Sequence, residues 1–151
     1  MHVKYILHDQ TLAITTTESS YYRTKIYEKE DIIYREESPL TIIQNSCEYY
    51  GYSLPSNLKL VKGILQRQSK LPIPVSPKNG LFFLPTNSYR NKECSWISFY
   101  KVAHYIEQKE SLQIIFHNGR TMNTNISLNQ FKLQMKRTSL IIAHFYNLYC
   151  I

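Results

Sequence analysis

The chain has 151 residues, of which 43% are hydrophobic and 13% aromatic, and its formal net charge is +7. This composition excludes a disordered tail, and the length suits a single domain, residues 1–151, whose core needs no metal or disulfide to stabilise it. The three cysteines lack the short spacing of metal ligands and are expected to be reduced thiols, and no apolar run is long enough to cross a membrane, so we expect a cytoplasmic protein.

The first third of the chain is predicted to form short antiparallel strands. Thr, Ile and Tyr are concentrated in three segments that polar turns separate, and most of the acidic residues of this third lie in those turns. β-Branched and aromatic residues favour strands because their side chains pack well on a pleated surface. The three predicted strands are residues 11–17, 24–27 and 32–34.

Two helices are predicted next. Ser38 followed by Pro39 is typical of a helix start, since the serine hydroxyl can cap a backbone N–H and proline suits the first helical position. Gly51 is typical of the end of this helix. Apolar residues recur at helical spacing again within residues 56–68, and this segment is predicted as a second helix although Gly63 lies inside it.

The second half of the chain is predicted to form further strands and a long last helix. Asn79-Gly80 is typical of a tight turn before a strand and predicts a hairpin, and Asn118-Gly119 predicts a second hairpin. Ser127 is expected to cap the last helix. The predicted strands are residues 81–84, 96–105, 112–116 and 121–125. The fold class is therefore α+β: an antiparallel β-sheet with two or three helices, including a long C-terminal helix.

The last helix is predicted to be amphipathic. Its basic residues Lys132, Lys136 and Arg137 are expected to point away from an apolar face that packs against the rest of the protein. Lys132 and Lys136 lie on adjacent turns of one side of the helix without a carboxylate between them, so their charges add. The apolar face consists of Leu128, Phe131, Met135, Ile142 and Phe145.

Charge is sorted along the sequence. Residues 1–48 carry five basic and eight acidic residues, whereas residues 49–151 carry thirteen basic and three acidic residues, and no acidic residue occurs in residues 49–92. A field of one sign raises the local concentration of polyanions, so nucleic acid is the first partner to consider. The alternative is a basic surface that is only solvated.

The candidate DNA-binding residues are ten basic residues of that C-terminal part. Long cations on helices and in Ser- and Asn-bearing loops suit phosphate contacts, whereas base reading needs Arg or Asn placed in a groove. The sequence predicts the first role and leaves the second open. The ten candidates are Lys59, Lys62, Arg67, Lys70, Arg90, Lys92, Arg120, Lys132, Lys136 and Arg137.

No enzymatic site is predicted. The five histidines are scattered, the carboxylates are concentrated in the first third, and neither a glycine-rich phosphate-binding motif nor a metal-ligand spacing occurs. We therefore expect no catalytic residues, no metal and no other cofactor. Cys47 suggests a metal or redox role and Trp96 a wedge between DNA bases, but both positions favour packing in the core.

The sequence has no zinc-finger spacing, no basic region leading into heptads and no clear helix-turn-helix. It does contain five short segments, in a distinctive order, that resemble the bacterial competence transcription factor family, ComK. The likeness extends over residues 39–145 and includes Phe131, Gln134 and Arg137-Thr138 near the C-terminus. The five segments are residues 47–51 (CEYYG), 70–77 (KLPIPVSP), 83–86 (FLPT), 94–98 (CSWIS) and 116–119 (FHNG).

This resemblance implies a DNA-binding transcriptional activator of genes for DNA uptake. It implies recognition of paired A·T-rich boxes in double-stranded DNA, largely through the minor groove and through DNA bending, and self-association on DNA, with RNA polymerase as a further candidate partner. Narrow A-tract grooves attract Arg and Lys, and DNA deformability supplies specificity at bases that are never touched, which suits a dispersed basic surface. The implied location is the cytoplasm, in association with the nucleoid.

Longer members of the family continue beyond the last helix into a tail with a motif for an adaptor, which delivers the protein to a protease. Because this sequence ends at Ile151, adaptor–protease control through that motif is not expected. An alternative function is that of a truncated, non-enzymatic interaction module that pairs with a full-length family member and modulates it. The acidic first third is expected to face away from DNA and to be available for contacts between subunits.

Overall fold

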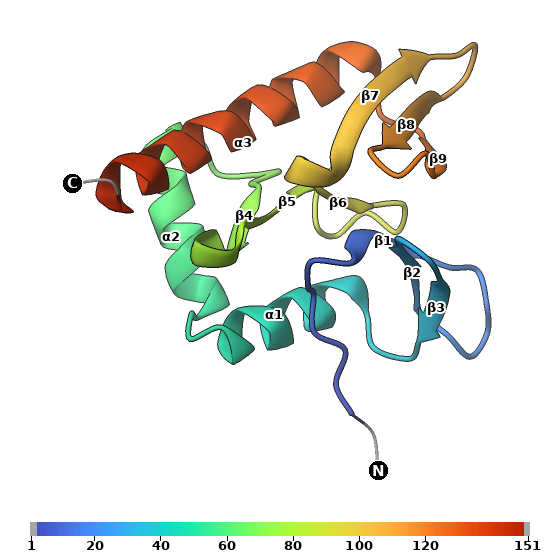
Figure 1. Ribbon diagram of the computed structural model, residues 1–151, viewed down its shortest axis with the longest axis horizontal. Coiled ribbons are helices and arrows are strands. Elements are labelled where there is room, and N and C mark those ends of the chain that lie inside the picture. Colours follow the sequence, from blue (N-terminus) through green and yellow to red (C-terminus); the bar gives the residue numbers. More distant parts are fainter. Residues whose placement is uncertain (1–2, 150–151) are drawn as a thin grey trace.

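The computed structural model describes residues 3–149 and, within them, combines antiparallel strands with three α-helices (Figure 1). The strands are β1 (Thr11–Thr16), β2 (Thr24–Glu28), β3 (Ile32–Arg35), β4 (Ile73–Ser76), β5 (Leu81–Pro85), β6 (Trp96–Ser98), β7 (Val102–Glu107), β8 (Leu112–Phe116) and β9 (Thr121–Thr124). The helices are α1 (Pro39–Tyr49), α2 (Leu54–Leu65) and α3 (Leu128–Tyr149), with short 3-10 helices η1 (Pro77–Asn79) and η2 (Phe99–Lys101).

The strands form two sheets within the described residues. The larger sheet has the order β3-β2-β1-β6-β5-β4, and the smaller sheet has the order β7-β8-β9. All strand pairs in both sheets are antiparallel. The α+β class with a long C-terminal helix is confirmed, whereas the expectation of one sheet is wrong. No helix in residues 3–149 combines the length and apolarity that crossing a bilayer requires.

The first two helices begin at serine caps. The Ser38 hydroxyl accepts a hydrogen bond from the backbone N–H of Thr41 at 3.2 Å, which confirms the predicted start of α1. The Ser53 hydroxyl accepts one from the backbone N–H of Ser56 at 3.1 Å, so α2 begins two residues before the predicted segment. The turn between the helices is consequently four residues long, and Gly51 adopts a positive φ of 89° in it.

The predicted hairpin at Asn79-Gly80 is confirmed, and its first strand, β4, lies in the proline-rich segment after α2, for which no strand bounds were predicted. In β4, Pro74 lies opposite Phe82 of β5. Proline cannot donate a hydrogen bond to a neighbouring strand, but β4 lies at the edge of the larger sheet and pairs only with β5. The prolines therefore exclude a helix here without excluding an edge strand.

The predicted strand at residues 96–105 is wrong as a continuous element. Its first part is β6 of the larger sheet, its last part is β7 of the smaller sheet, and η2 redirects the chain between them. Lys101 fixes this bend, because its ammonium group binds the Asp9 carboxylate at 2.9 Å and its backbone carbonyl accepts a hydrogen bond from the N–H of His117 at 3.0 Å. These are contacts distant in sequence, so a local pattern does not reveal them.

The core lies on both faces of the larger sheet. Strands β1, β5 and β6 are buried at consecutive positions, and alternate residues contribute to different apolar clusters. Ile14, Phe83 and Trp96 pack with α1 on one face. The neighbouring residues Ala13, Leu84 and Ile97 pack with the smaller sheet and Phe131 of α3 on the other.

The predicted core positions of Trp96 and Cys47 are confirmed. Trp96 is 2% exposed and its ring lies 4.8 Å from that of Tyr89, so it is not available as a wedge between bases. Cys47 and Cys94 are buried free thiols, while Cys150 lies outside the described residues. Burial raises the pKa of the Cys47 thiol to about 11, which keeps it protonated and unreactive at neutral pH.

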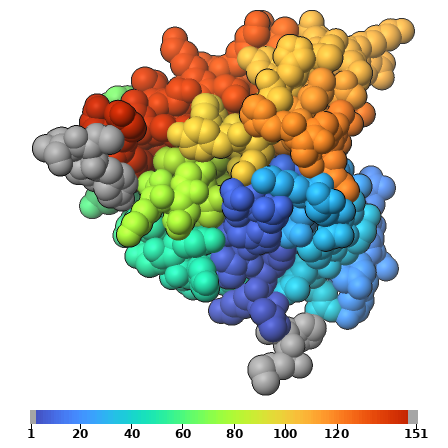
Figure 2. All heavy atoms as spheres, in the orientation of Figure 1, coloured from blue at the N-terminus to red at the C-terminus, as the bar shows by residue number. Residues whose placement is uncertain are grey.

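The charge sorting of the sequence is also a sorting in space. The strands of the first third with their acid-rich turns and α1 (blue to teal) lie on one side of the molecule, and α3 with β7–β9 (red to gold) lies on the other (Figure 2). From residue 111 onward the sequence has no acidic residue. The side of the molecule formed by α3 is therefore poor in carboxylates.

Candidate nucleic-acid interface

Helices α2 and α3 pack against each other and, together with the loop after α2, carry seven of the ten candidate DNA-binding residues. Val61 of α2 shares an apolar cluster with Ile141 and Phe145 of α3, and the two helices are in contact. Neither helix contains an acidic residue. We call α2, α3 and the loop after α2 the basic helix pair. It contains Lys59, Lys62, Arg67, Lys70, Lys132, Lys136 and Arg137.

The cations of the basic helix pair form no ion pairs within the described residues. Lys59, Lys62, Lys132 and Lys136 are exposed, and the other three are half-buried. In the part of the chain that the structure describes, the ion pairs involve only Asp9, Glu28 and Glu37 as acids, and none of the ten candidate residues takes part. The positive charge is therefore free to act on a ligand.

Arg137 is held differently from its neighbours. Its Nη1 donates to Oε1 of Gln134 at 2.9 Å, and the side chain is half-buried, whereas Lys132 and Lys136 are exposed. Burial, and secondly the nearby charge of Arg67, lower the pKa of Arg137. Two arginines thus lie close enough to repel each other.

Gln134 is a structural anchor for this arrangement. Its side chain is 1% exposed, and its Nε2 donates to the backbone carbonyls of Lys70 at 3.0 Å and Pro85 at 2.8 Å. The residue thereby joins α3 to the loop after α2 and to the end of β5. The sequence contained no signal for this role, because the three partners meet only in the tertiary structure.

Helices α1 and α2 are connected like the two helices of a helix-turn-helix, through a four-residue turn that contains Gly51. This connection was not predicted because the start of α2 was placed two residues too late. The exposed residues of α2 include Lys59 and Lys62 but, within this described helix, no Arg, Asn or Gln. Its one asparagine, Asn57, is buried and donates to the carbonyl of Pro74 at 3.1 Å. The helix is equipped for phosphate contacts and lacks the usual base-reading side chains.

Three candidates lie apart from the basic helix pair. Arg90 and Lys92 are exposed in the loop between β5 and β6, and Arg120 is half-buried in the turn between β8 and β9. In Figure 1, α2 and the C-terminal half of α3 lie at one end of the molecule, whereas the β1–β2 loop and β9 lie at the other. Arg90 and Lys92 line a groove at this second end together with Arg23, which the sequence analysis did not select because it belongs to the acidic third.

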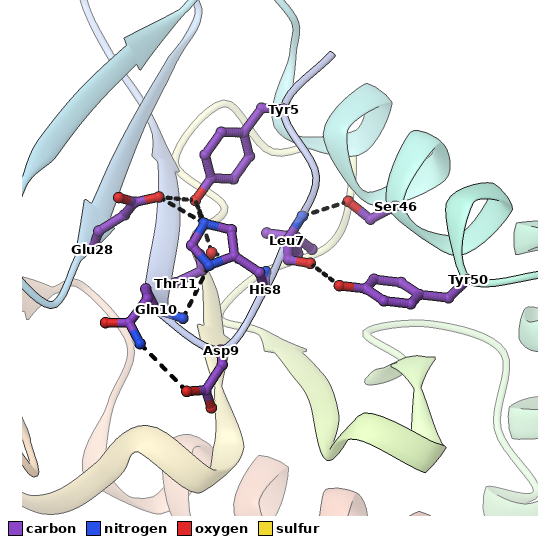
Figure 3. Close-up of polar contacts among 9 residues, drawn as sticks. All are labelled: Tyr5, Leu7, His8, Asp9, Gln10, Thr11, Glu28, Ser46 and Tyr50. Atoms are coloured by element: carbon purple, nitrogen blue, oxygen red, sulfur yellow. Dashed lines mark hydrogen bonds and ion pairs between the residues drawn. The ribbon is translucent and has the colours of Figure 1, made fainter. Parts of the chain in front are cut away.

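A polar cluster in the first third involves the segment before β1 (Figure 3). The Tyr5 hydroxyl donates to Oε2 of Glu28 at 2.5 Å, and Nε2 of His8 lies 2.9 Å from the same oxygen. Burial and the bond to Glu28 hold the pKa of Tyr5 far above its usual range, so the hydroxyl remains a donor. The cluster fastens this segment to β2, and within residues 3–149 no three potential ligands converge on a metal position.

Comparison with known proteins identifies the family to which the chain belongs. The family model described as ComK protein matches residues 2–147, so the chain belongs to the ComK family. A relative from Bacillus subtilis (strain 168), named competence transcription factor, is 32% identical over 123 residues. The match covers 81% of this chain and 64% of the relative, so the chain spans less than two thirds of that protein's length. No solved structure matches the chain.

Proposed function

We propose that the chain is a DNA-binding transcriptional regulator that activates competence genes. Membership of the ComK family and the name of the Bacillus subtilis relative support the biological role. The observation that carries DNA binding is the basic helix pair: two packed helices and the loop after α2, which together contain seven cations and no carboxylate. A duplex presents phosphates at regular intervals along both strands, and such a surface fits them.

The unpaired charges of the basic helix pair give an energetic reason for binding DNA. Cations without carboxylate partners repel one another in the free protein, and Arg67 and Arg137 do so at short range. Phosphates bound on this surface replace that repulsion with attraction and release condensed counterions. Binding by this route is strong at low salt, weak at high salt and largely independent of base sequence.

Sequence preference must then come from features other than base reading by α2. Its exposed residues supply lysines but no bidentate base reader. Narrow minor grooves of A·T-rich DNA attract Arg and Lys, and the cost of bending depends on sequence. The proposal therefore includes recognition of A·T-rich boxes through the minor groove, with Arg90, Lys92 and Arg120 as the loop cations that reach it. Bending DNA over several boxes also favours self-association on DNA. The acidic side of the molecule is available for these contacts between subunits. Activation of transcription then requires contact with RNA polymerase.

The test is a titration of the purified chain with two duplexes of equal length at several salt concentrations. One duplex contains two A·T-rich boxes, and the other is G·C-rich. We expect binding that falls steeply with salt on both and is tighter on the first. Equal affinities would refute the A·T preference. Absence of DNA binding, combined with firm association with a longer family member, would replace the proposal with an interaction module that modulates that protein.

A further inference from the structure

A groove of about 810 Å³ lies where the two sheets and α1 meet. It is bordered by the end of β1, the β1–β2 loop, the start of α1, the β5–β6 loop and the end of β9. Its volume is in the range of small-molecule binding sites. The basic helix pair contributes no residue to the groove, which is therefore separate from that surface, although Arg90 and Lys92 of the groove are also among the loop cations of the proposed function.

The groove carries cations from two loops. Arg23 of the β1–β2 loop and Arg90 and Lys92 of the β5–β6 loop line it, and all three are exposed. Two carboxylates, Glu18 and Glu93, also line it. Oε2 of Glu93 accepts a hydrogen bond from the side-chain amide of Asn125 at 3.1 Å, and neither carboxylate forms an ion pair within the described residues. The cations are thus available to an anionic ligand.

The start of α1 adds a further anion-binding group. Pro39 has no N–H, and the N–H of Thr41 is bound by the Ser38 hydroxyl, which leaves the N–H of Leu40 without a partner among the described residues. Ser38, Pro39 and Leu40 all line the groove, and the first turn contains no acidic residue. The N-terminal end of a helix favours a negative charge at this position.

The β5–β6 loop is held in place by hydrogen bonds to β1. The Thr16 hydroxyl donates to the carbonyl of Lys92, and the Ser95 hydroxyl donates to the Thr15 hydroxyl at 2.8 Å. Within the loop, the backbone N–H of Glu93 donates to Oδ1 of Asn91 at 2.8 Å. A loop fixed in this way presents Arg90 and Lys92 without a large ordering cost on binding.

An aromatic side chain of the groove points to a ligand larger than phosphate alone. Tyr22 lines the groove, and its ring is supported by Tyr21 at 4.9 Å and Tyr34 at 5.8 Å, so a fixed aromatic surface is available for stacking.

From these features we propose that the groove binds a nucleoside phosphate. The phosphate contacts Arg23, Arg90, Lys92 and the N–H of Leu40, and the base stacks on Tyr22. Either a free nucleotide or a nucleotide unit of a DNA strand supplies this chemistry, and only the second source depends on the proposed function.

The test uses isothermal titration of the full chain with ADP, with inorganic phosphate and with a single-stranded oligonucleotide. The variant Arg90→Gln/Lys92→Gln removes two groove cations, and Lys4→Gln/Lys109→Gln removes two exposed lysines elsewhere as the matched control. Circular dichroism establishes that each variant is folded. We expect the groove variant to weaken ADP binding at least tenfold, the control to leave it unchanged, and Tyr22→Leu to weaken binding of ADP but not of phosphate.

The outcomes separate the two sources. ADP binding that is lost in the groove variant supports a free nucleotide as ligand. Oligonucleotide binding that is lost in this variant, without ADP binding, supports a nucleotide of DNA. Binding of neither, or equal binding by the wild type and the groove variant, would overturn the proposal. Absence of duplex binding by the wild type would refute the proposed function while leaving an ADP result intact.

Discussion

Replacing Lys132 and Lys136 with alanine should flatten the salt dependence of DNA binding. Both side chains are exposed on one side of α3 and form no ion pair within residues 3–149, so each is free to contact a phosphate. Each phosphate contact contributes about 0.9 to the slope of log K against log salt, so the double variant should lose about 1.8. A rise from about 50 to about 200 mM salt should then weaken the wild type roughly 12-fold more than the variant.

Arg137 should contribute little to that slope. Its guanidinium is half-buried and donates to Gln134, so it is not free to follow a phosphate in the way that an exposed lysine is. Adding Arg137→Ala to the double variant should leave the slope nearly unchanged while lowering the stability of the fold. The sequence alone would have predicted three equivalent contacts, and the structure reduces this number to two.

Fluorescence anisotropy with a labelled duplex, at five or more salt concentrations, measures the slope. The control is Lys4→Ala/Lys109→Ala, which removes the same charge from two exposed positions outside α2 and α3. If the α3 variant keeps the wild-type slope, α3 does not contact DNA. If the control flattens the slope equally, net charge alone drives binding, and the role of the basic helix pair is refuted.

Three further predictions concern the supporting structure, each measured by urea unfolding. Gln134→Ala removes the donors to the carbonyls of Lys70 and Pro85 and should cost about 2–4 kcal/mol, which unchanged stability would contradict. Gly51→Ala should cost about 1–2 kcal/mol because of its positive φ, whereas Gly63→Ala in α2 should stabilise by about 0.5–1 kcal/mol, since no heavy atom would crowd either new methyl group. Burial raises the pKa of the Cys47 thiol from 9.0 to about 11, so on raising the pH the thiol of the unfolded chain ionises before that of the folded chain. The free energy of unfolding should therefore fall between about pH 9 and 11, and it should fall less for the variant Cys47→Ala.

The fold was predictable where local chemistry determines structure. Strands β1, β2, β3 and β8 and the start of α1 follow from β-branched residues and from the Ser38-Pro39 cap. The division into two sheets was not predictable, because residues 96–105 favour a strand throughout and the bend at η2 depends on Lys101, Asp9 and His117. The hairpin of β4 and β5 follows from Asn79-Gly80, but the bounds of β4 did not, because Pro74 is tolerated only at a sheet edge and an edge position is a property of the whole sheet.

The candidate site shows the same division. The carboxylate-free character of α2 and α3 is a property of the sequence, and it identified seven cations that the structure brings into one helix pair. The groove was not foreseeable, because it combines Arg23 of the acidic third with Arg90 and Lys92 from a loop more than sixty residues away. Because Arg23 lies in the acidic first third of the sequence, counting charge along the chain does not select it as a candidate.

The lack of carboxylates in the basic helix pair is unfavourable for the free protein. Solubility does not require it, since a surface with both signs interspersed is soluble and avoids repulsion. The chain does contain acidic residues, but those in ion pairs lie in the first third, where Asp9 binds Lys101 and Glu28 binds His8. Arg67 and Arg137 are left to repel each other. A polyanion would relieve this repulsion, so stabilisation of the fold by DNA and weakening of DNA binding by salt are two consequences of the same unpaired charges.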